Sequence, residues 1–422
     1  MSALPIHMKV LISGAGMAGS SLAFWLAKLG HEVTVIERFP DLRATGLQID
    51  LRGHGISVLK RMGLSDIYRS MAVPEQGLQV VDRSGRRRAF FPANTSGKGL
   101  QSFTTDWEIM RGDLCHLLHD AAVKHGAKYV FGSMVEGFQE KEVEGLEVNF
   151  KDGKKEVFDL LVGADGVHSR TRTMMLPGAP DAFYPIGASR GSGTIIAYCT
   201  IPCPIQEGEE YIATMFMAPG RRGVMTRRNN ADSIQAYLGY TTNLAGIDRM
   251  NSARGDITKQ KSVLTETLRG AGWRMEELLK SLGDATDFYC EHLGLVKLEK
   301  WSRGRVVLLG DAAYCPSVNT GMGTTSALVG AYILAGEIGR VDKGAEGLEG
   351  SLQAYENKFR PFMDQVQKGV DESGSEMPSS AFSIGVLNIL MGVASFFKVD
   401  IGSWMIKEKV KNWDLPEYKD MV

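Results

Sequence analysis

The segment Gly14-Ala15-Gly16-Met17-Ala18-Gly19 most constrains what this chain of 422 residues can fold into. It follows a short apolar stretch at 8–13 and precedes an apolar stretch at 18–29, after which a β-branched stretch occupies 32–36. This order predicts a strand, a glycine turn, a helix and a second strand, which together form a βαβ unit with parallel strands. We therefore predict an α/β fold with a Rossmann-like parallel sheet.

The spacing of these glycines also predicts a ligand. In a G-x-G-x-x-G turn the first glycine permits the turn, the second lets a pyrophosphate approach the backbone, and the third lets the helix pack on the strand. Glu37 ends the second strand, 18 residues after Gly19, where a carboxylate can bind ribose hydroxyls. The motif predicts a cofactor that contains ADP. A plain glycine-rich turn is the alternative, and these residues do not separate NAD from FAD.

Two later apolar stretches, at 158–162 and 305–309, are each followed by an aspartate and by glycines. An aspartate at a strand end can bind a polyol, and glycines that open a helix can direct its dipole at an anion. A flavin cofactor carries both groups, so these segments favour FAD. The residues concerned are Asp165 after the first stretch, and Gly310, Asp311, Gly321 and Gly323 after the second.

Together these motifs resemble those of the FAD-dependent aromatic hydroxylases, the p-hydroxybenzoate hydroxylase-like flavoprotein monooxygenases, over roughly residues 8–365. The resemblance implies that the first motif holds the ADP part of FAD and that Asp311 binds the ribityl and pyrophosphate region. It implies that Asp165 serves both FAD and NAD(P)H, and that Arg111 binds FAD from a helix start. Thr325 and Gly330 depart from the family, which often has Asn and Asp in the helix after the glycines.

A second resemblance concerns the stretch from Arg43 to Asp50, which is similar to one in the tetracycline-inactivating members. It implies that Arg43 contacts NADPH and that Asp50 contacts FAD. We add Arg38, next to Glu37, to the predicted cofactor-binding residues.

The family resemblance also implies an activity. NAD(P)H, as NADPH or NADH, would reduce FAD, and the reduced flavin would capture O2 as a C4a-hydroperoxide that hydroxylates an aromatic or polycyclic small molecule. The cofactor carries this chemistry, and the sequence patterns do not identify a catalytic base. The alternatives are a flavoprotein oxidase or reductase without oxygen insertion, and an FAD-fold protein that sequesters a metabolite.

A change to short, β-rich segments beyond residue 180 predicts that the chain is divided into domains. We predict a discontinuous FAD-binding domain at 1–178 and 295–375, and an inserted substrate-binding domain with an antiparallel β-sheet at 179–294. A C-terminal helical segment would occupy 376–422. Residues of one face of the inserted sheet would contact the substrate, although ordinary sheet packing is the alternative for each, because strand side chains alternate between faces. The predicted contacts are Met215, Phe216, Met225 and Tyr237.

Charge and cysteine content narrow the class of protein further. With 48 basic and 49 acidic side chains the formal net charge is −1, which argues against a nucleic-acid partner. Five cysteines without a C-x-x-C pair indicate reduced thiols, and the start of the chain lacks a signal-peptide pattern. We therefore predict a cytoplasmic protein. Cys115 and His119 share a helix face but lack a third nearby ligand, so no metal site is predicted.

Residues 377–397 carry no charge and reach the length of a membrane span. Pro378, Asn388 and several serines dilute this segment. We predict a C-terminal helix packed over the substrate domain, and contact of this segment with a membrane is the alternative.

Overall fold

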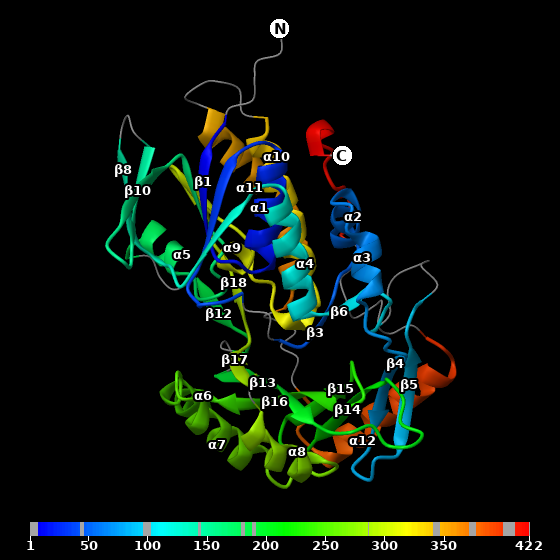
Figure 1. Cartoon of the computed structure of the whole chain (residues 1–422). Coiled ribbons are helices and arrows are strands. Elements are labelled where there is room, and N and C mark those ends of the chain that lie inside the picture. Colours follow the sequence, from blue (N-terminus) through cyan, green and yellow to red (C-terminus); the bar gives the residue numbers. More distant parts are fainter. Residues whose placement is uncertain are drawn as a thin grey trace.

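The chain folds around two main sheets, one of six strands and one of seven, which Figure 1 shows one above the other. The computed structural model describes residues 7–42, 46–95, 103–141, 145–178, 182–187, 191–285, 287–340, 347–370, 377–399 and 410–421.

The six-stranded sheet has the order β19-β20-β11-β1-β2-β7, and every pairing except β19–β20 is parallel. Helices cover one of its faces, and a smaller three-stranded sheet with one short helix covers the other (Figure 1). Its central strand is therefore a continuous apolar run in which Val10, Leu11 and Ile12 are fully buried. The predicted α/β fold is confirmed. The strands are β1 (Lys9–Ser13), β2 (Glu32–Glu37), β7 (Lys128–Phe131), β11 (Leu160–Gly163), β19 (Ser302–Arg303) and β20 (Val306–Leu308).

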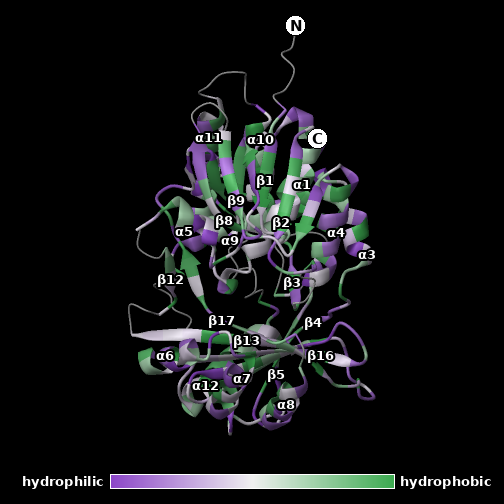
Figure 2. Cartoon of the chain, turned by 60° about the vertical axis from the view of Figure 1, so that its left-hand side comes forward, coloured by the Kyte–Doolittle hydropathy of each residue, from purple (hydrophilic) through white to green (hydrophobic). Residues whose placement is uncertain are grey.

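Helix α10 (Gly323–Ile338) is the central helix of this half and is buried along almost its whole length. It packs against α1, and α1 packs in turn against α4 (Figure 2). The long buried helix explains why residues 323–338 are apolar on every side. The other helices of this half are α1 (Met17–Lys28), α2 (His54–Arg61), α3 (Ser65–Ser70), α4 (Arg111–Lys124), α5 (Arg170–Met175), α9 (Asp311–Tyr314) and α11 (Gly347–Gln367).

The seven-stranded sheet has the order β17-β13-β16-β15-β14-β4-β5. Its neighbours are antiparallel except β14 and β4, which run parallel. Strands β4 and β5 end before residue 93 and the other five begin only at Ser192, and the sequence patterns did not indicate that the first two would extend this sheet. The strands are β4 (Gly77–Val81), β5 (Arg87–Pro92), β13 (Ser192–Pro202), β14 (Ala213–Ala218), β15 (Arg222–Arg227), β16 (Ser233–Asn243) and β17 (Tyr289–His292).

Each face of the seven-stranded sheet has a different neighbour. Helices α6 (Leu244–Ser252), α7 (Ile257–Leu268) and α8 (Met275–Ser281) lie on the face that points away from the six-stranded sheet (Figure 1). The buried core on that side includes Leu238, Leu264 and Leu278. The opposite face is therefore the one turned toward the six-stranded sheet.

Three smaller sheets complete the described chain. The pair β3–β6 lies between the two main sheets in Figure 1. The strands are β3 (Gln48–Asp50) and β6 (Glu108–Met110); β8 (Val135–Lys141), β9 (Gly145–Phe150) and β10 (Lys155–Phe158); and β12 (Phe183–Pro185) and β18 (Gly294–Val296).

Helix α12 (Ala381–Phe396) packs along the edge strand β5. The Ser395 hydroxyl accepts a hydrogen bond from the Phe90 N–H at 3.0 Å and donates one to the Phe90 carbonyl at 2.7 Å, so it occupies the free edge of the sheet. The outward side chains Phe382 and Phe396 are exposed. Within the described residues, no helix is both long enough and apolar enough to cross a membrane.

Candidate active site

The glycine turn before α1 is tightly packed on one side and open on the other. A Cβ atom at Gly14 would lie 2.4 Å from the carbonyl oxygen of Ala164, and one at Gly19 would lie 2.0 Å from the carbonyl oxygen of Gly14. Packing therefore requires glycine at both positions. A Cβ atom at Gly16 would meet nothing within 4 Å. The open side of the turn thus lies at the N-terminus of α1, where a phosphate can approach backbone N–H groups.

Glu37 braces this turn. Its Oε2 accepts a hydrogen bond from the Ala15 N–H at 3.0 Å, and its Oε1 accepts one from the Phe39 N–H at 3.2 Å. The Arg38 guanidinium lies over the Phe39 ring, 4.9 Å from its centroid. The structure thus places Glu37 against the turn, and its contact with a ribose stays a prediction.

The strand pair β3–β6 brings Asp50 close to the start of α4. Asp50 Oδ2 accepts a hydrogen bond from Arg52 Nε, and the Arg111 N–H donates to the Leu47 carbonyl at 3.1 Å. Gly46 has a φ of +134°, and a Cβ there would lie 2.7 Å from the Arg111 side chain. Only glycine therefore lets this strand approach α4 so closely. Asp50 and Arg111 border the same cavity.

Asp311 follows β20 at a tight turn. Gly310 has a φ of +65°, and a Cβ there would lie 2.8 Å from the Cβ of Ala18 in α1. Protein surrounds the Asp311 carboxyl but leaves it open to the cavity. Burial raises its pKa, and a hydrogen bond from Cys315 and the charge of Arg111 oppose that shift. A ligand that donates hydrogen bonds here would favour the ionised carboxylate.

The loop after Asp311 presents a second polar group. Ser317 is buried with a φ of +67°, an uncommon conformation for a residue other than glycine. The residue borders the cavity, and its hydroxyl is buried without a hydrogen-bond partner in the described chain. Gly321 then adopts a φ of +64°, and α10 begins at Gly323. A buried hydroxyl in this state suits a polar ligand.

The Asp165 carboxylate makes its hydrogen bonds to residues that follow it closely in the sequence. Its Oδ1 accepts a hydrogen bond from the Ser169 hydroxyl at 2.5 Å, and its Oδ2 accepts two from Thr171, both at 3.0 Å. The neighbouring Val167 and His168 border the cavity. The role of Asp165 toward a cofactor stays a prediction, as does that of Arg43, which lies outside the described residues.

The two departures from the family pattern have structural reasons. The Thr325 hydroxyl accepts from the Arg52 N–H and donates to the Arg52 carbonyl, each at 3.0 Å, which ties α10 to the segment after β3. A Cβ at Gly330 would lie 2.0 Å from the Tyr314 hydroxyl oxygen. Both residues therefore serve packing around α10.

A single cavity of about 940 Å3 lies between the six-stranded and seven-stranded sheets. Asp50, Arg111 and Asp311 border it on one side, and Met225 and Tyr237 border it on the other. This volume lies at the upper end of the range for ligand sites. The cavity brings together residues that the sequence predicted separately for a cofactor and for a substrate.

The substrate-side wall is a row made of one residue from each of five neighbouring strands, β14, β15, β16, β13 and β17. Adjacent members of this row are register partners, which places every side chain on the same face. The Tyr198 ring stacks on Tyr289 with centroids 4.6 Å apart, and Tyr237 meets Tyr198 edge-on at 5.6 Å. We call Met215, Met225, Tyr237, Tyr198 and Tyr289, in strand order, the cavity row.

Phe216 differs from the other three predicted substrate contacts. It borders the cavity, but its ring packs against Trp273 in the core under α7 and α8, with centroids 5.8 Å apart. Strand alternation explains this, because Met215 points into the cavity and its neighbour must point away. We therefore leave Phe216 out of the proposed substrate contacts.

The segment before α12 closes the far side of the cavity. Gly223 and Gly239 are register partners on the cavity face, and Cβ atoms there would lie 3.3 Å and 3.1 Å from the side chain of Met377. This glycine pair forms a notch that receives Met377. Leu387 and Met391 of α12 border the cavity beyond it. The C-terminal segment is thus part of the cavity wall.

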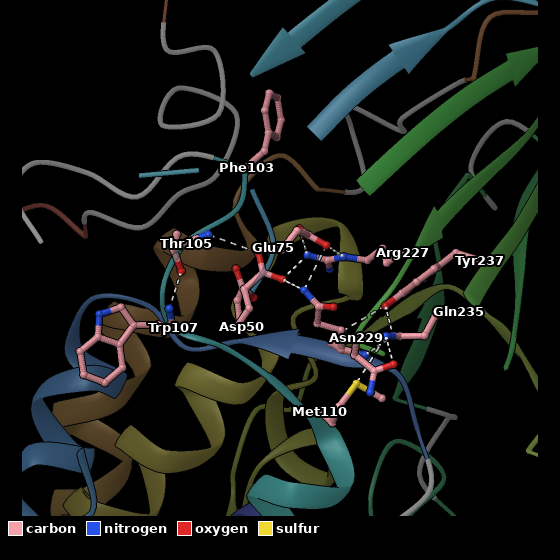
Figure 3. Close-up of polar contacts among 12 residues, drawn as sticks. Asp50, Glu75, Phe103, Thr105, Trp107, Met110, Arg227, Asn229, Gln235 and Tyr237 are labelled. Atoms are coloured by element: carbon pink, nitrogen blue, oxygen red, sulfur yellow. Dashed lines mark hydrogen bonds and ion pairs between the residues drawn. The ribbon is translucent and has the colours of Figure 1, made fainter. Parts of the chain in front are cut away.

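A buried polar cluster stands beside the cavity row, and sequence reasoning missed it (Figure 3). Arg227 binds Glu75 through two hydrogen bonds, of 2.8 Å and 2.6 Å, and also contacts Glu108 Oε2. Burial raises the pKa of Glu108 to about 8, with the Glu75 and Asp50 carboxylates adding to the rise and Arg227 opposing it. A signal was present, because Glu108 stands between the apolar Trp107 and Ile109.

The described residues fit the FAD that the sequence motifs predict. The open side of Gly16 gives room for a pyrophosphate, and Asp311 borders the cavity as a polar partner for a ligand. No group of three or more His, Cys, Asp or Glu side chains suited to a metal ion occurs in the part of the chain that the structure describes.

Comparisons with known proteins agree with this geometry. Residues 7–370 match the family model described as FAD binding domain. The chain is 47% identical over 435 residues to the FAD-dependent monooxygenase asL4 of Sarocladium schorii, covering 99% of both chains. It is 38% identical to the flavin-dependent monooxygenase eupH of Phoma sp, over 92% of both. The crystal structure of tetracycline destructase Tet(55) is similar with a TM-score of 0.78 and 28% identity, covering 99% of this chain and 100% of that one.

Proposed function

Because this chain belongs to the FAD binding domain family and is an FAD-dependent monooxygenase, we propose that it uses NADPH or NADH and O2 to hydroxylate an aromatic or polycyclic small molecule. One observation carries the proposal. The cavity has Asp50, Arg111 and Asp311 on one wall and the cavity row on the other, so a cofactor and an aromatic substrate would meet inside it.

We propose that the chain holds FAD along one line of residues. The turn at 14–19 would receive the ADP part at the N-terminus of α1. Asp311 would accept hydrogen bonds from the hydroxyl groups of the cofactor. Asp50 and Arg111, which border the same cavity, would also contact the cofactor. When bound, FAD supplies the redox chemistry that activates oxygen. The residues of the chain bind, orient and exclude water.

The cavity row suits an aromatic or polycyclic substrate. Tyr198, Tyr237 and Tyr289 present ring faces and edges with which a flat substrate can stack. Met215 and Met225 continue the row with flexible, polarizable side chains that adapt to irregular shapes. Similarity to a tetracycline destructase supports the polycyclic class, because tetracycline is polycyclic. The apolar walls would also keep water from the reacting atoms.

We propose that Arg43 contacts NAD(P)H, as the resemblance implies. An arginine suits the task, because its planar cation pairs with phosphate or stacks on a ring. Arg43→Ala should slow flavin reduction by NADPH or NADH in rapid-mixing absorbance measurements and leave bound FAD nearly stoichiometric. Reduction at the wild-type rate at all nicotinamide concentrations would show that Arg43 does not serve this step.

The proposed function is tested with FAD-loaded enzyme, NADPH or NADH, and a panel of phenolic polycyclic compounds. We expect some compounds to stimulate nicotinamide consumption and to give a hydroxylated product with less than stoichiometric hydrogen peroxide. Tyr289→Leu should weaken this stimulation, and Tyr184→Leu, at an exposed tyrosine outside the cavity, should not. Consumption that ends wholly in hydrogen peroxide would indicate an oxidase instead.

A further inference from the structure

Exposed apolar side chains gather on and just after helix α12, which lies beside β5 in Figure 1. Sixteen large apolar residues of the described chain are exposed, and eight of them lie within 382–399. The other eight are spread over 39–318. Single exposed apolar residues are ordinary, whereas a concentration of them marks an interaction surface.

The exposed side chains of α12 form one line along the helix. Their spacings of three and four residues, with one adjacent pair, place them on one side of a helix that has 3.6 residues per turn. Phe382 and Phe396, near its two ends, are 82% and 81% exposed. No charged residue occurs within 377–397. We call the following residues the apolar stripe: Phe382, Val386, Ile389, Leu390, Val393 and Phe396.

The opposite side of α12 attaches the helix to the seven-stranded sheet. Ile384 is buried, and Met391 packs against core residues of β4 and β5. The Ser395 hydroxyl is bonded to the backbone of Phe90 in β5, and a capping box at Ser380 stabilises the first turn. These contacts fix the orientation of the helix, so the apolar stripe is a constant part of the protein surface.

Positive charges lie next to the helix. The hairpin that joins β4 to β5 carries four exposed arginines: Arg83, Arg86, Arg87 and Arg88. Its single carboxylate, Asp82, forms an ion pair with Arg88, so four guanidinium groups stand against one negative charge. The hairpin borders α12 directly, because a Cβ atom at Gly392 would lie 2.8 Å from the Arg88 carbonyl oxygen. We call residues 82–88 the basic hairpin.

The length and the charge of this region favour a lipid surface as its partner. Helix α12 has 16 residues, fewer than the about 20 that cross a bilayer, so it can lie in the interface but not span it. Arginines beside an apolar helix are attracted to anionic lipid headgroups. A second copy of the chain would instead bring a second basic hairpin to the contact, and the like charges would oppose self-association.

The apolar stripe also shares a residue with the cavity wall. Leu390 is exposed and borders the cavity, and Leu387 and Met391 of the same helix border it too. The apolar lining of the cavity thus continues onto the apolar surface of α12. A lipid layer on the stripe would lie against the wall of the cavity.

We propose that α12 docks on an anionic lipid surface, with the apolar stripe among the acyl chains and the basic hairpin against the lipid phosphates. This inference goes beyond the proposed function and does not depend on the reaction. It assigns the enzyme an interaction surface at the C-terminal helix, outside the residues that we propose for the cofactor and the substrate.

The test is flotation of the FAD-loaded full chain with lipid vesicles. We expect about tenfold stronger partitioning onto phosphatidylcholine vesicles that contain phosphatidylserine than onto phosphatidylcholine alone, and salt should weaken it. Phe382→Ser/Phe396→Ser should reduce partitioning onto the anionic vesicles by about tenfold, because two exposed rings no longer enter the lipid. The matched control, Leu244→Ser/Ile257→Ser, changes two exposed residues of α6 and α7 and should partition as wild type does.

The basic hairpin has a separate readout. Arg86→Gln/Arg87→Gln should reduce partitioning onto the anionic vesicles toward the level of the neutral ones and leave the neutral level unchanged. Lys259→Gln/Lys280→Gln removes two exposed charges from α7 and α8 and should change neither level. Thermal midpoints and bound FAD confirm that each variant is folded, since every changed side chain is exposed.

Three results would overturn the inference. The first is a wild-type enzyme that does not float with anionic vesicles, or that floats equally well with neutral ones. The second is wild-type partitioning by Phe382→Ser/Phe396→Ser, which would place the lipid contact elsewhere. The third is a wild-type dimer in analytical ultracentrifugation that this variant separates into monomers, which would assign the apolar stripe to a second copy of the chain.

Discussion

The two walls of the cavity are built in different ways. The cofactor-side wall comes from short segments that carry Asp50, Arg111 and Asp311. Gly310, next to Asp311, packs against Ala18 of the turn at 14–19, where Gly14 and Gly19 permit close backbone packing. The substrate-side wall comes from five strands whose cavity-row members span residues 198–289 and meet only through strand register. A local motif thus specifies the first wall, whereas long-range pairing specifies the second. Substrate choice can therefore change while the cofactor motif stays intact.

The largest expected effect lies in the glycine turn. Gly19→Val should prevent stable folding, because its Cβ would lie 2.0 Å from a backbone oxygen that cannot move aside. The loss should exceed the about 1–3 kcal/mol typical of overpacking. Gly16→Ala is the matched control, since its Cβ meets open space, and it should keep the fold and weaken FAD binding. Equal thermal midpoints for both variants would break the distinction between the packed and open sides of the turn.

The next effect separates the two faces of one strand. Phe216→Ala should lower the free energy of unfolding by about 3–5 kcal/mol, because the ring fills the core beside Trp273. Met215→Ala should cost less stability, because that side chain is half-buried, but should weaken 2-naphthol binding. Chemical denaturation and calorimetry measure the two quantities. A weaker probe affinity in Phe216→Ala alone would reverse the assignment of the faces.

A smaller effect tests the cofactor-side wall. Asp311→Ala should weaken FAD binding by about 1.5–3 kcal/mol, because a charged hydrogen-bond acceptor is lost. Asp120→Ala, at an exposed aspartate of α4, should leave the FAD dissociation constant unchanged. The apo form of Asp311→Ala should be no less stable than wild type, since burial disfavours the charge of Asp311. Equal FAD dissociation constants in the two variants would contradict the assigned role.

The last effect concerns the polar cluster between the walls, which consists of Gln48, Glu75, Glu108, Arg227 and Gln235. The pKa of Glu108 rises from 4.5 to about 8 on folding, so the folded state holds a proton that the unfolded state releases. Stability should therefore fall as pH rises from 4.5 to about 8, because the unfolded state releases this proton over that range and the folded state keeps it. Glu75, Asp50 and Arg227 face Glu108 and set this shift. Glu108→Gln should flatten the profile, and a slope identical to wild type would contradict a protonated Glu108.

The contrast between the walls also explains what sequence could predict. The turn at 14–19, the strands around it and the family follow from local spacing, because these residues meet within one βαβ unit. The parallel pairing of β4 with β14 could not be predicted, because the residues of neither strand indicate which strand it pairs with. The same holds for the polar cluster, in which Glu75 binds both Gln48 and Arg227 although the three residues lie far apart in the sequence. The spacing of a motif predicts contacts between residues that are close in the sequence. Contacts between distant residues depend on strand register, which the sequence patterns do not show.

The most direct test of the account is oxygen-isotope labelling during turnover of a phenolic polycyclic substrate by FAD-loaded enzyme. The account predicts that the hydroxylated product carries the heavy isotope when the O2 gas is labelled and does not when the water is labelled. A product labelled from water, or a product without added oxygen and with stoichiometric hydrogen peroxide, would contradict it.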